Sequence, residues 1–225
     1  MTIHAAERPT RSTRWVPFAL IALVLVPAIA GSLRLVELAG GPHLLPVNAR
    51  LTASPLPVAL HVVCAVAYAV LGAFQFAPRL RGSRPLWHPA AGRLLVGLGL
   101  AVALSALWMT LLYPRQPGTG ELAYVFRLVF GSGMAASIIL GFTAVRRGDI
   151  GRHRAWMTRA YALALGAGTQ VFTQGIGNAV LGTNTLTADL MLGAGWIINL
   201  AVAEYVIHRH SSIQRSSPAI AKAAA

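Results

Sequence analysis

Six apolar runs, each close to the length that crosses a bilayer, dominate the sequence. A helix needs about 20 consecutive apolar residues to span the hydrocarbon core. The runs cover approximately residues 15–36, 57–77, 89–112, 122–145, 155–179 and 188–208. Only 11% of the residues are charged, whereas a soluble domain averages about 25%. The sequence therefore predicts an all-α, polytopic membrane helix bundle of about six transmembrane helices, which form one domain over residues 15–210.

The basic residues are distributed unevenly between the connections. Fifteen of the 19 Lys and Arg residues lie in the two tails or around the connections after the second and fourth runs. The other four are Arg34, Arg50, Arg115 and Arg127. Because loops rich in Lys and Arg stay in the cytoplasm, both termini are predicted to be cytoplasmic, in a bacterial cytoplasmic (inner) membrane. The net charge of +13 therefore indicates membrane orientation; nucleic-acid binding is excluded because no polar domain carries a basic patch.

The two ends of the chain carry separate expectations. Residues 1–14 are predicted to be a cytoplasmic tail, and residues 211–225, which are small and polar, a disordered cytoplasmic tail. The sequence AIA at residues 28–30 also resembles a signal-peptide cleavage site, and cleavage would leave five helices. The apolar run continues beyond this site, which favours a helix that is retained.

Rows of small residues suggest where helices approach one another. Gly97, Ala101 and Ser105 are four residues apart, and so are Gly133, Ser137 and Gly141. Small residues let membrane helices pack closely, because lipid supplies no hydrophobic effect between them. With 22 glycines in the chain, such rows also arise from composition alone, and the sequence does not decide between the two.

Two histidines stand where helices enter the membrane from the basic side. His88 and His153 begin the third and fifth runs, with Arg93 and Arg159 somewhat deeper. Neutral imidazoles from two helices can clamp one haem, and guanidinium groups suit its propionates. The pattern predicts haem b binding, or another redox-linked function. His61 is a weaker candidate: it lies well inside the second run, where a histidine serves either function or packing.

A second class of function fits the same basic surface. An anionic lipid or an isoprenoid phosphate could bind to a pocket formed there, as in a carrier, transferase or cyclase. Helix N-termini also attract anions. The candidate anion-binding residues are Arg79, Arg93, Arg152, Arg154 and Arg159. A third class is a structural subunit of a membrane complex, and the arginines by themselves also serve to fix topology.

The remaining chemistry in the sequence is sparse. Glu204 is the acid best placed within the membrane zone, either as a proton-transfer group or as the partner of an arginine. The single Cys64 excludes an internal disulfide framework and a CxxC motif. The sequence has no Ser-His-Asp order, Walker loop or HExxH motif. The expected partners are membrane lipids, a partner membrane protein or a second copy of the chain. The only metal that the sequence suggests is a haem iron. The substrate, the reaction and whether the protein is an enzyme stay open.

Two stretches of the chain carry a family resemblance. GAFQFAPRLRGSRPLWHPAAGRLLV (72–96) and RRGDIGRHRAWMTRAYAL (146–163) resemble a bacterial family of multi-spanning membrane proteins of unknown function, DUF2306, over roughly residues 57–180. In that family the first histidine is usually followed by Arg, whereas this chain has Pro89. The resemblance implies the membrane fold but no activity. Its motif positions are Gln75, Phe76, Pro78, Arg79, His88, Gly92, Arg93, Gly148, Asp149, His153, Trp156, Met157, Arg159 and Tyr161.

Overall fold

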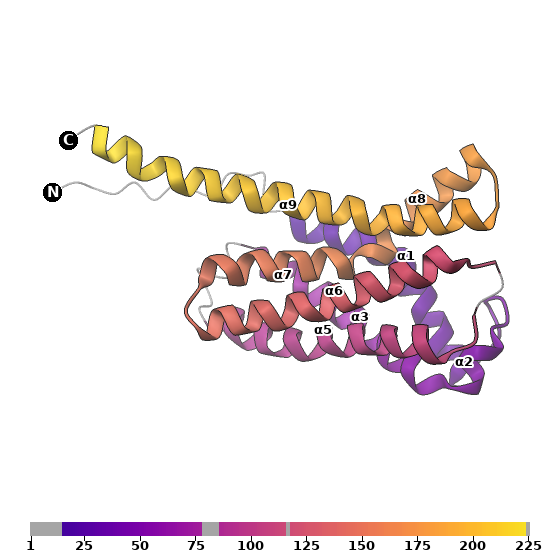
Figure 1. Cartoon of the computed structure of the whole chain (residues 1–225). Coiled ribbons are helices and arrows are strands. Elements are labelled where there is room, and N and C mark those ends of the chain that lie inside the picture. The colour runs from indigo at the N-terminus through magenta and orange to yellow at the C-terminus, as the bar shows by residue number, and fades with distance from the viewer. Residues whose placement is uncertain (1–14, 78–85, 116–117, 224–225) are drawn as a thin grey trace.

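The computed structural model describes residues 15–77, 86–115 and 118–223, with side chains as far as Arg209. This part is helical and contains no strand, so the predicted all-α class is confirmed. Figure 1 shows its eight helices. They are α1 (Val16–Leu38), α2 (Ala49–Ala53), α3 (Pro55–Gln75), α5 (Trp87–Leu112), α6 (Glu121–Arg146), α7 (Ile150–Ala164), α8 (Gly166–Leu181) and α9 (Thr185–Ala223).

Five of the described helices are long and apolar enough to cross a membrane by themselves: α1, α3, α5, α6 and the part of α9 over Thr185–Arg209. α7 and α8 together carry the chain along the bundle a sixth time. The Asp189 carboxylate near the start of α9 accepts a hydrogen bond from the Gly120 N–H, 3.1 Å away, just before α6. Since α7 begins where α6 ends, α7 and α8 must carry the chain back across. The prediction of about six crossings holds, with the fifth divided into two helices.

The division at Leu165 is stabilised by side chains of α9. Trp196 Nε1 donates to the carbonyl of Leu163 at 3.2 Å, and Asn199 Nδ2 donates to the carbonyl of Ala162 at 3.1 Å. A broken helix in a membrane needs such donors, because lipid cannot satisfy carbonyl groups that leave the helical pattern. Gly166 has no side chain, and this leaves room for the Trp196 indole beside the break.

The helices pack in a defined order. α1 lies against α3 and α8, α3 against α5, α5 against α6, and α6 against α7, while α9 covers α7 and α8. α1 begins, and α9 leaves the bundle, at the same end (Figure 1). We call this the basic end. Its described arginines are Arg93, Arg146, Arg147, Arg152, Arg154, Arg159 and Arg209.

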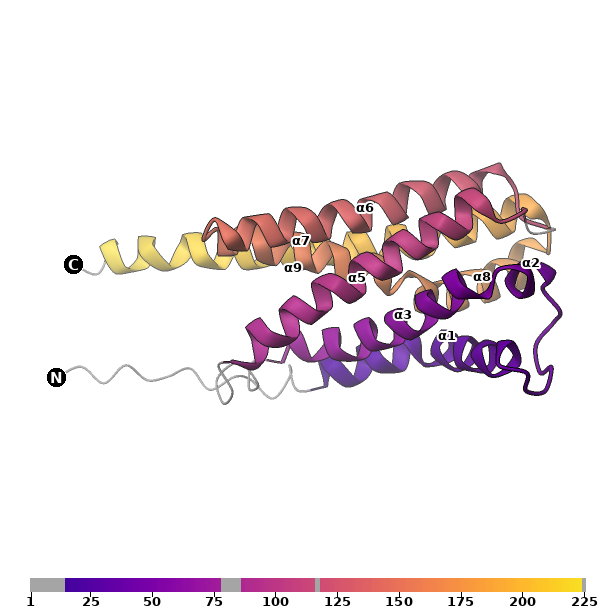
Figure 2. The same cartoon turned by 90° about the horizontal axis from the view of Figure 1, so that it is seen from below.

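α5 and α6 are close in the half of the bundle away from the basic end and diverge toward it (Figure 2). In the close half, a Cβ on Gly99 would lie 2.7 Å from both Ile138 and Tyr68, so only glycine fits there. A Cβ on Gly131 would likewise lie 3.1 Å from Leu107. The divergence toward the basic end leaves space that the candidate site uses.

The two rows of small residues have different roles. Gly141 lies against α7, where a Cβ would come within 2.9 Å of Met157, and Ser137 beside it is buried. The second row is therefore a helix contact. A Cβ on Gly97 would meet nothing within 4 Å, and Ser105 instead lies 3.1 Å from His61.

The ends of the chain differ in part from expectation. α9 continues to Ala223, so the structure is helical over most of residues 211–225, where the sequence predicts disorder. A helix that is already formed extends without a new nucleation cost, which explains how a polar, alanine-containing tail continues it. The predicted tail over residues 1–14 lies outside the described residues. α1 packs against α3 and α8, so its removal by signal-peptide cleavage would expose both helices.

Candidate functional site

A cavity of about 720 Å³ lies at the basic end between α3, α5, α6 and α7. This volume is within the range of small-molecule and cofactor sites. α5 packs against α3 and α6, whereas α7 packs against α6 and α9, so α5 and α7 face each other across the cavity. The lining residues are Tyr68, Gly72, Gln75, Phe76, His88, Pro89, Gly92, Arg93, Leu95, Val96, Gly97, Phe142, Val145, Arg146, His153, Met157 and Tyr161.

Helical periodicity brings these residues to one place. On α7, His153, Met157 and Tyr161 are four residues apart and form a single stripe along the helix. The stripe extends over eight residues, or about 12 Å along the axis. The cavity therefore reaches from the basic end roughly 12 Å into the bundle, which is most of one leaflet.

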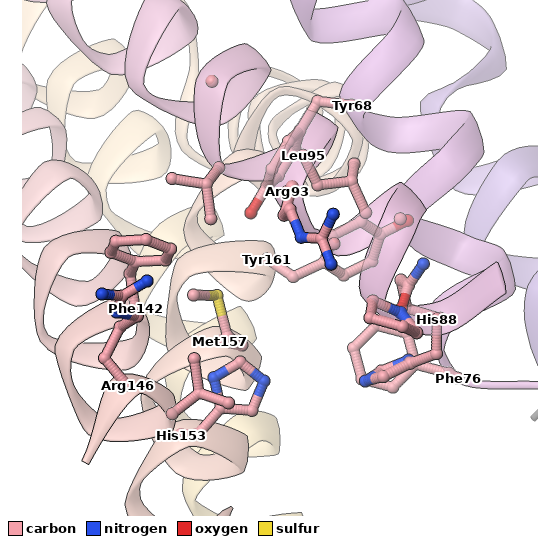
Figure 3. Close-up of a pocket in the computed structure, with 17 residues that line it drawn as sticks. Tyr68, Phe76, His88, Arg93, Leu95, Phe142, Arg146, His153, Met157 and Tyr161 are labelled. Carbon is pink, nitrogen blue, oxygen red and sulfur yellow. The ribbon is translucent and has the colours of Figure 1, made fainter. Parts of the chain in front are cut away.

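The two predicted histidine candidates line the same cavity. His88 comes from α5 and His153 from α7, and Figure 3 shows them on opposite sides of the open space. His153 Nδ1 lies 2.9 Å from the carbonyl oxygen of Gly141. Because a carbonyl only accepts, Nδ1 carries the proton in this bond, and Nε2 of the neutral ring keeps its lone pair.

Two arginines of the cavity have no acidic partner among the described residues. Arg93 and Arg146 make no ion pair with any carboxylate in the part of the chain that the structure describes. Four other arginines do: the pairs are Arg34–Glu37, Arg115–Glu121, Arg152–Asp149 and Arg159–Glu204. The cavity thus carries two guanidinium groups whose charge no described side chain balances, beside walls that are largely apolar.

Two buried tyrosines form the wall farthest from the basic end. Their ring centroids are 5.9 Å apart. The Tyr161 hydroxyl donates to the carbonyl of Ala69 at 2.6 Å. The Tyr68 side chain is equally buried, but its hydroxyl makes no hydrogen bond within the described residues and points into the cavity (Figure 3). Tyr68 therefore offers a donor to whatever occupies the space.

Arg159 does not line the cavity, although the sequence pairs it with Arg93. Its guanidinium makes two hydrogen bonds to Glu204 of α9, at 2.5 and 2.8 Å, and lies 4.7 Å from the centre of the Trp156 ring. Glu204 is thus the partner of an arginine, one of the two roles that the sequence left open for it. Arg159 joins α7 to α9 instead of facing α5.

The other sequence candidates lie elsewhere. Arg152 and Arg154 are exposed on α7, away from the cavity lining, and Arg79 lies outside the described residues. His61 Nδ1 is 3.1 Å from both the Val102 carbonyl and the Ser105 hydroxyl of α5, an interhelical contact in the opposite half of the bundle. No group of three or more His, Cys, Asp or Glu residues in the described part could hold a metal ion.

Arg146 and Tyr68 line the cavity although the sequence did not predict them as residues of the site. Arg146 is one of two adjacent arginines that end α6, and nothing in the sequence tells which of them faces inward. Tyr68 shares a helical face with Gln75, and this periodicity was the available signal. Its relevance depends on the divergence of α5 and α6, which the sequence does not reveal.

The fold and the cavity define an integral membrane helix bundle with a basic, mostly apolar-walled cavity at one end. The chain belongs to the family described as "Predicted membrane protein (DUF2306)", whose match covers residues 58–207. The match extends past residue 180, where the resemblance seen in the sequence ends, and into α9. The comparison with curated proteins found no match, and the comparison with solved structures found none either.

The motif positions of the family resemblance converge on the cavity. Eight of them line it, from α3, α5, α7 and the residue that follows α3. They are Gln75, Phe76, His88, Gly92, Arg93, His153, Met157 and Tyr161. Two stretches that are far apart in the sequence therefore build one site.

Proposed function

We propose that the protein binds haem b in this cavity, with His88 and His153 as axial ligands, in a cytoplasmic membrane whose inner face is the basic end. The observation that carries the proposal is that both imidazoles line one cavity from helices on opposite sides of it. A haem iron with two histidine ligands cycles between the ferric and ferrous states and serves electron transfer.

The surroundings of His153 support a ligand role. Its Nδ1–H is directed to the Gly141 carbonyl, and such a bond fixes the tautomer and ring orientation of ligating histidines in general. The glycine at position 141 lets α7 approach α6 closely enough for this contact. Met157, one turn further along α7, lines the same wall and offers a thioether to the same space.

The arginines and the glycines suit the rest of the porphyrin. Arg93 and Arg146 would neutralise propionates near the membrane surface. Gly92, which precedes Arg93 on α5, also lines the cavity, and a Cβ there would meet nothing within 4 Å. A flat, apolar macrocycle needs such an open, side-chain-free surface.

An absorption spectrum of the detergent-purified protein, oxidised and then reduced with dithionite, tests this proposal. We expect a Soret band and reduced b-type bands that are lost in His88→Ala and in His153→Ala. His61→Ala is the matched control, because His61 contacts α5 outside the cavity, and it should keep the bands. A featureless wild-type spectrum, from cells supplied with ample haem, would rule out haem b.

The second candidate is the binding of an anionic lipid or an isoprenoid phosphate. It is favoured by the two cavity arginines that have no acidic partner in the described residues, since phosphate oxygens match guanidinium donors. The apolar depth of the cavity would hold the chain of such a lipid. This candidate makes no use of the imidazoles as iron ligands.

Mass spectrometry of the lipids that remain bound through purification separates the two candidates. A retained acidic lipid should be lost in the double variant Arg93→Ala/Arg146→Ala. Arg152→Ala/Arg154→Ala is the control with the same change of charge, because both residues are exposed away from the cavity. Equal loss in both double variants would show surface association and count against a cavity ligand.

A further inference from the structure

We propose that the cavity opens sideways between α5 and α6 into the leaflet at the basic end, so that its occupant enters from the bilayer. The inference rests on the proposed function only in taking the occupant to be an amphiphile with acidic groups. It concerns the route and orientation of that molecule, and it applies to haem and to an acidic lipid alike.

Exposed lining residues border the opening on both sides. On α5 these are Pro89, Arg93 and Gly97, four residues apart along one edge of the helix. On α6 they are Phe142, Val145 and Arg146. A residue that both lines a cavity and is exposed marks the place where the cavity meets the surroundings. The edges of α5 and α6 therefore frame its mouth.

The mouth lies at the depth of lipid chains. Gly97 is ten residues beyond Trp87, the first residue of α5, which places it about 15 Å along the helix axis. Half of a bilayer core is also about 15 Å thick. On α6, Phe142 and Val145 are 39% and 36% exposed and lie about 6 Å and 1.5 Å along the axis from Arg146, nearer the basic end than Gly97. A bare glycine and an apolar ring are thus exposed within the leaflet at the basic end.

The order of chemical groups along the mouth sets the orientation of the occupant. Arg146 ends α6 at the basic end, and Arg93 lies about 9 Å along α5 from Trp87. Gly97 lies deeper than Arg93 on α5, and Phe142 lies deeper than Arg146 on α6. An amphiphile that moves in from the leaflet keeps its acidic groups on the arginines and its apolar body between Phe142 and Gly97.

Divergence of α5 and α6 keeps the mouth open. Figure 2 shows the two helices separating toward the basic end. A Cβ added to Gly97 would meet nothing within 4 Å, so a larger side chain there would narrow the mouth without displacing neighbours. Gly92 is open in the same way and also lines the cavity, but it is not exposed at the mouth. A larger side chain at Gly97 would therefore obstruct the mouth, and one at Gly92 the space behind it.

A spin-label measurement tests the opening without reference to any ligand. In a Cys64→Ala background, a nitroxide on Gly97→Cys in proteoliposomes should collide with oxygen and be protected from a water-soluble nickel chelate. The same label on Gly151→Cys, exposed in the first turn of α7, should show the reverse. Nickel accessibility at position 97 equal to that at position 151 would overturn the proposal, because the mouth would then face water.

The rate of loading tests the route. Haemin is the probe, dissolved in the vesicle membrane, and the Soret band reports its uptake. Gly97→Leu, at the mouth, should slow uptake about tenfold, whereas Gly92→Leu should mainly lower the final amplitude. Gly175→Leu, at an open position on α8, should change neither. An unchanged rate in Gly97→Leu would overturn the lateral route; no uptake by the wild type would instead refute haem binding, and the spin label would still decide the opening.

Discussion

The two tyrosines beside the cavity differ in one hydrogen bond, and this difference separates their roles. The Tyr161 hydroxyl donates a hydrogen bond to the backbone of α3, whereas the Tyr68 hydroxyl points into the cavity. A net contribution of about 1 kcal/mol is typical of such a bond. The hydroxyl of Tyr161 thus stabilises the fold, and that of Tyr68 is placed to bind the occupant of the cavity.

Phenylalanine substitutions in the ligand-free protein measure what each hydroxyl contributes to stability. Tyr161→Phe should lower the free energy of unfolding by about 1 kcal/mol, because the bond to Ala69 is lost. Tyr68→Phe should change it by less than about 0.5 kcal/mol, because no described partner is lost. Thermal unfolding in detergent compares the two variants. Equal destabilisation would mean that the Tyr68 hydroxyl has a protein partner, and it would remove Tyr68 from the site.

At the residue scale, the sequence predicts which groups are at the site better than which way they face. His88, His153 and Arg93 follow from their position at helix starts on the basic side, and all three line the cavity. Arg159 follows from the same rule but turns toward α9, where Glu204 binds it. A position near a helix start determines how deep a side chain lies in the membrane. The side of the helix from which it projects meets a particular neighbour, and this neighbour determines its role.

At the scale of elements, the junction of α7 and α8 depends on close contact with α1. A Cβ on Gly168 would collide with the backbone carbonyl of Leu23 in α1. Unlike a flexible side chain, a backbone atom cannot move aside without shifting its helix. Gly168 therefore fixes how closely α8 approaches α1, and with it the direction in which the chain leaves the break at Leu165.

Alanine substitutions test this contact. Gly168→Ala should destabilise the protein by about 1–3 kcal/mol, the usual cost of overpacking. Gly175→Ala, on the same helix but with nothing within 4 Å of the added Cβ, should be neutral or stabilising by up to about 1 kcal/mol, because alanine favours helix. Unfolding midpoints of the two variants give the comparison. A tolerated Gly168→Ala would show that α1 and α8 are not held at this distance.

The division between α7 and α8 at Leu165 could not be predicted from the apolar run that contains it. Residues 155–179 are one continuous apolar run without proline, and hydropathy predicts a single helix. The two helices arise because Trp196 and Asn199 on α9 supply donors for carbonyls at the junction. Those donors lie more than 30 residues away in the sequence, so no local pattern reveals them.

At the scale of the whole molecule, hydropathy and charge are sufficient for the bundle but not for its cavity. The lengths of the runs predict the crossings, and the arginine distribution predicts which ends share a side. The cavity depends on the angle between α5 and α6, which follows from close packing at Gly99 and Gly131 in one half only. A row of glycines in the sequence shows that helices can approach, but not where they separate.

The orientation of the whole chain is testable by labelling single cysteines in intact cells. In a Cys64→Ala background, Ala53→Cys and Thr183→Cys lie at the end opposite the arginine-rich one, and Arg147→Cys lies at the basic end; all three positions are exposed. A membrane-impermeant maleimide applied to spheroplasts should label positions 53 and 183 and reach position 147 only after permeabilisation. Thr183 is the decisive site, because it follows α8. If positions 147 and 183 were labelled alike, α7 and α8 would turn back within the membrane instead of crossing it, and the two termini of the chain would lie on opposite sides.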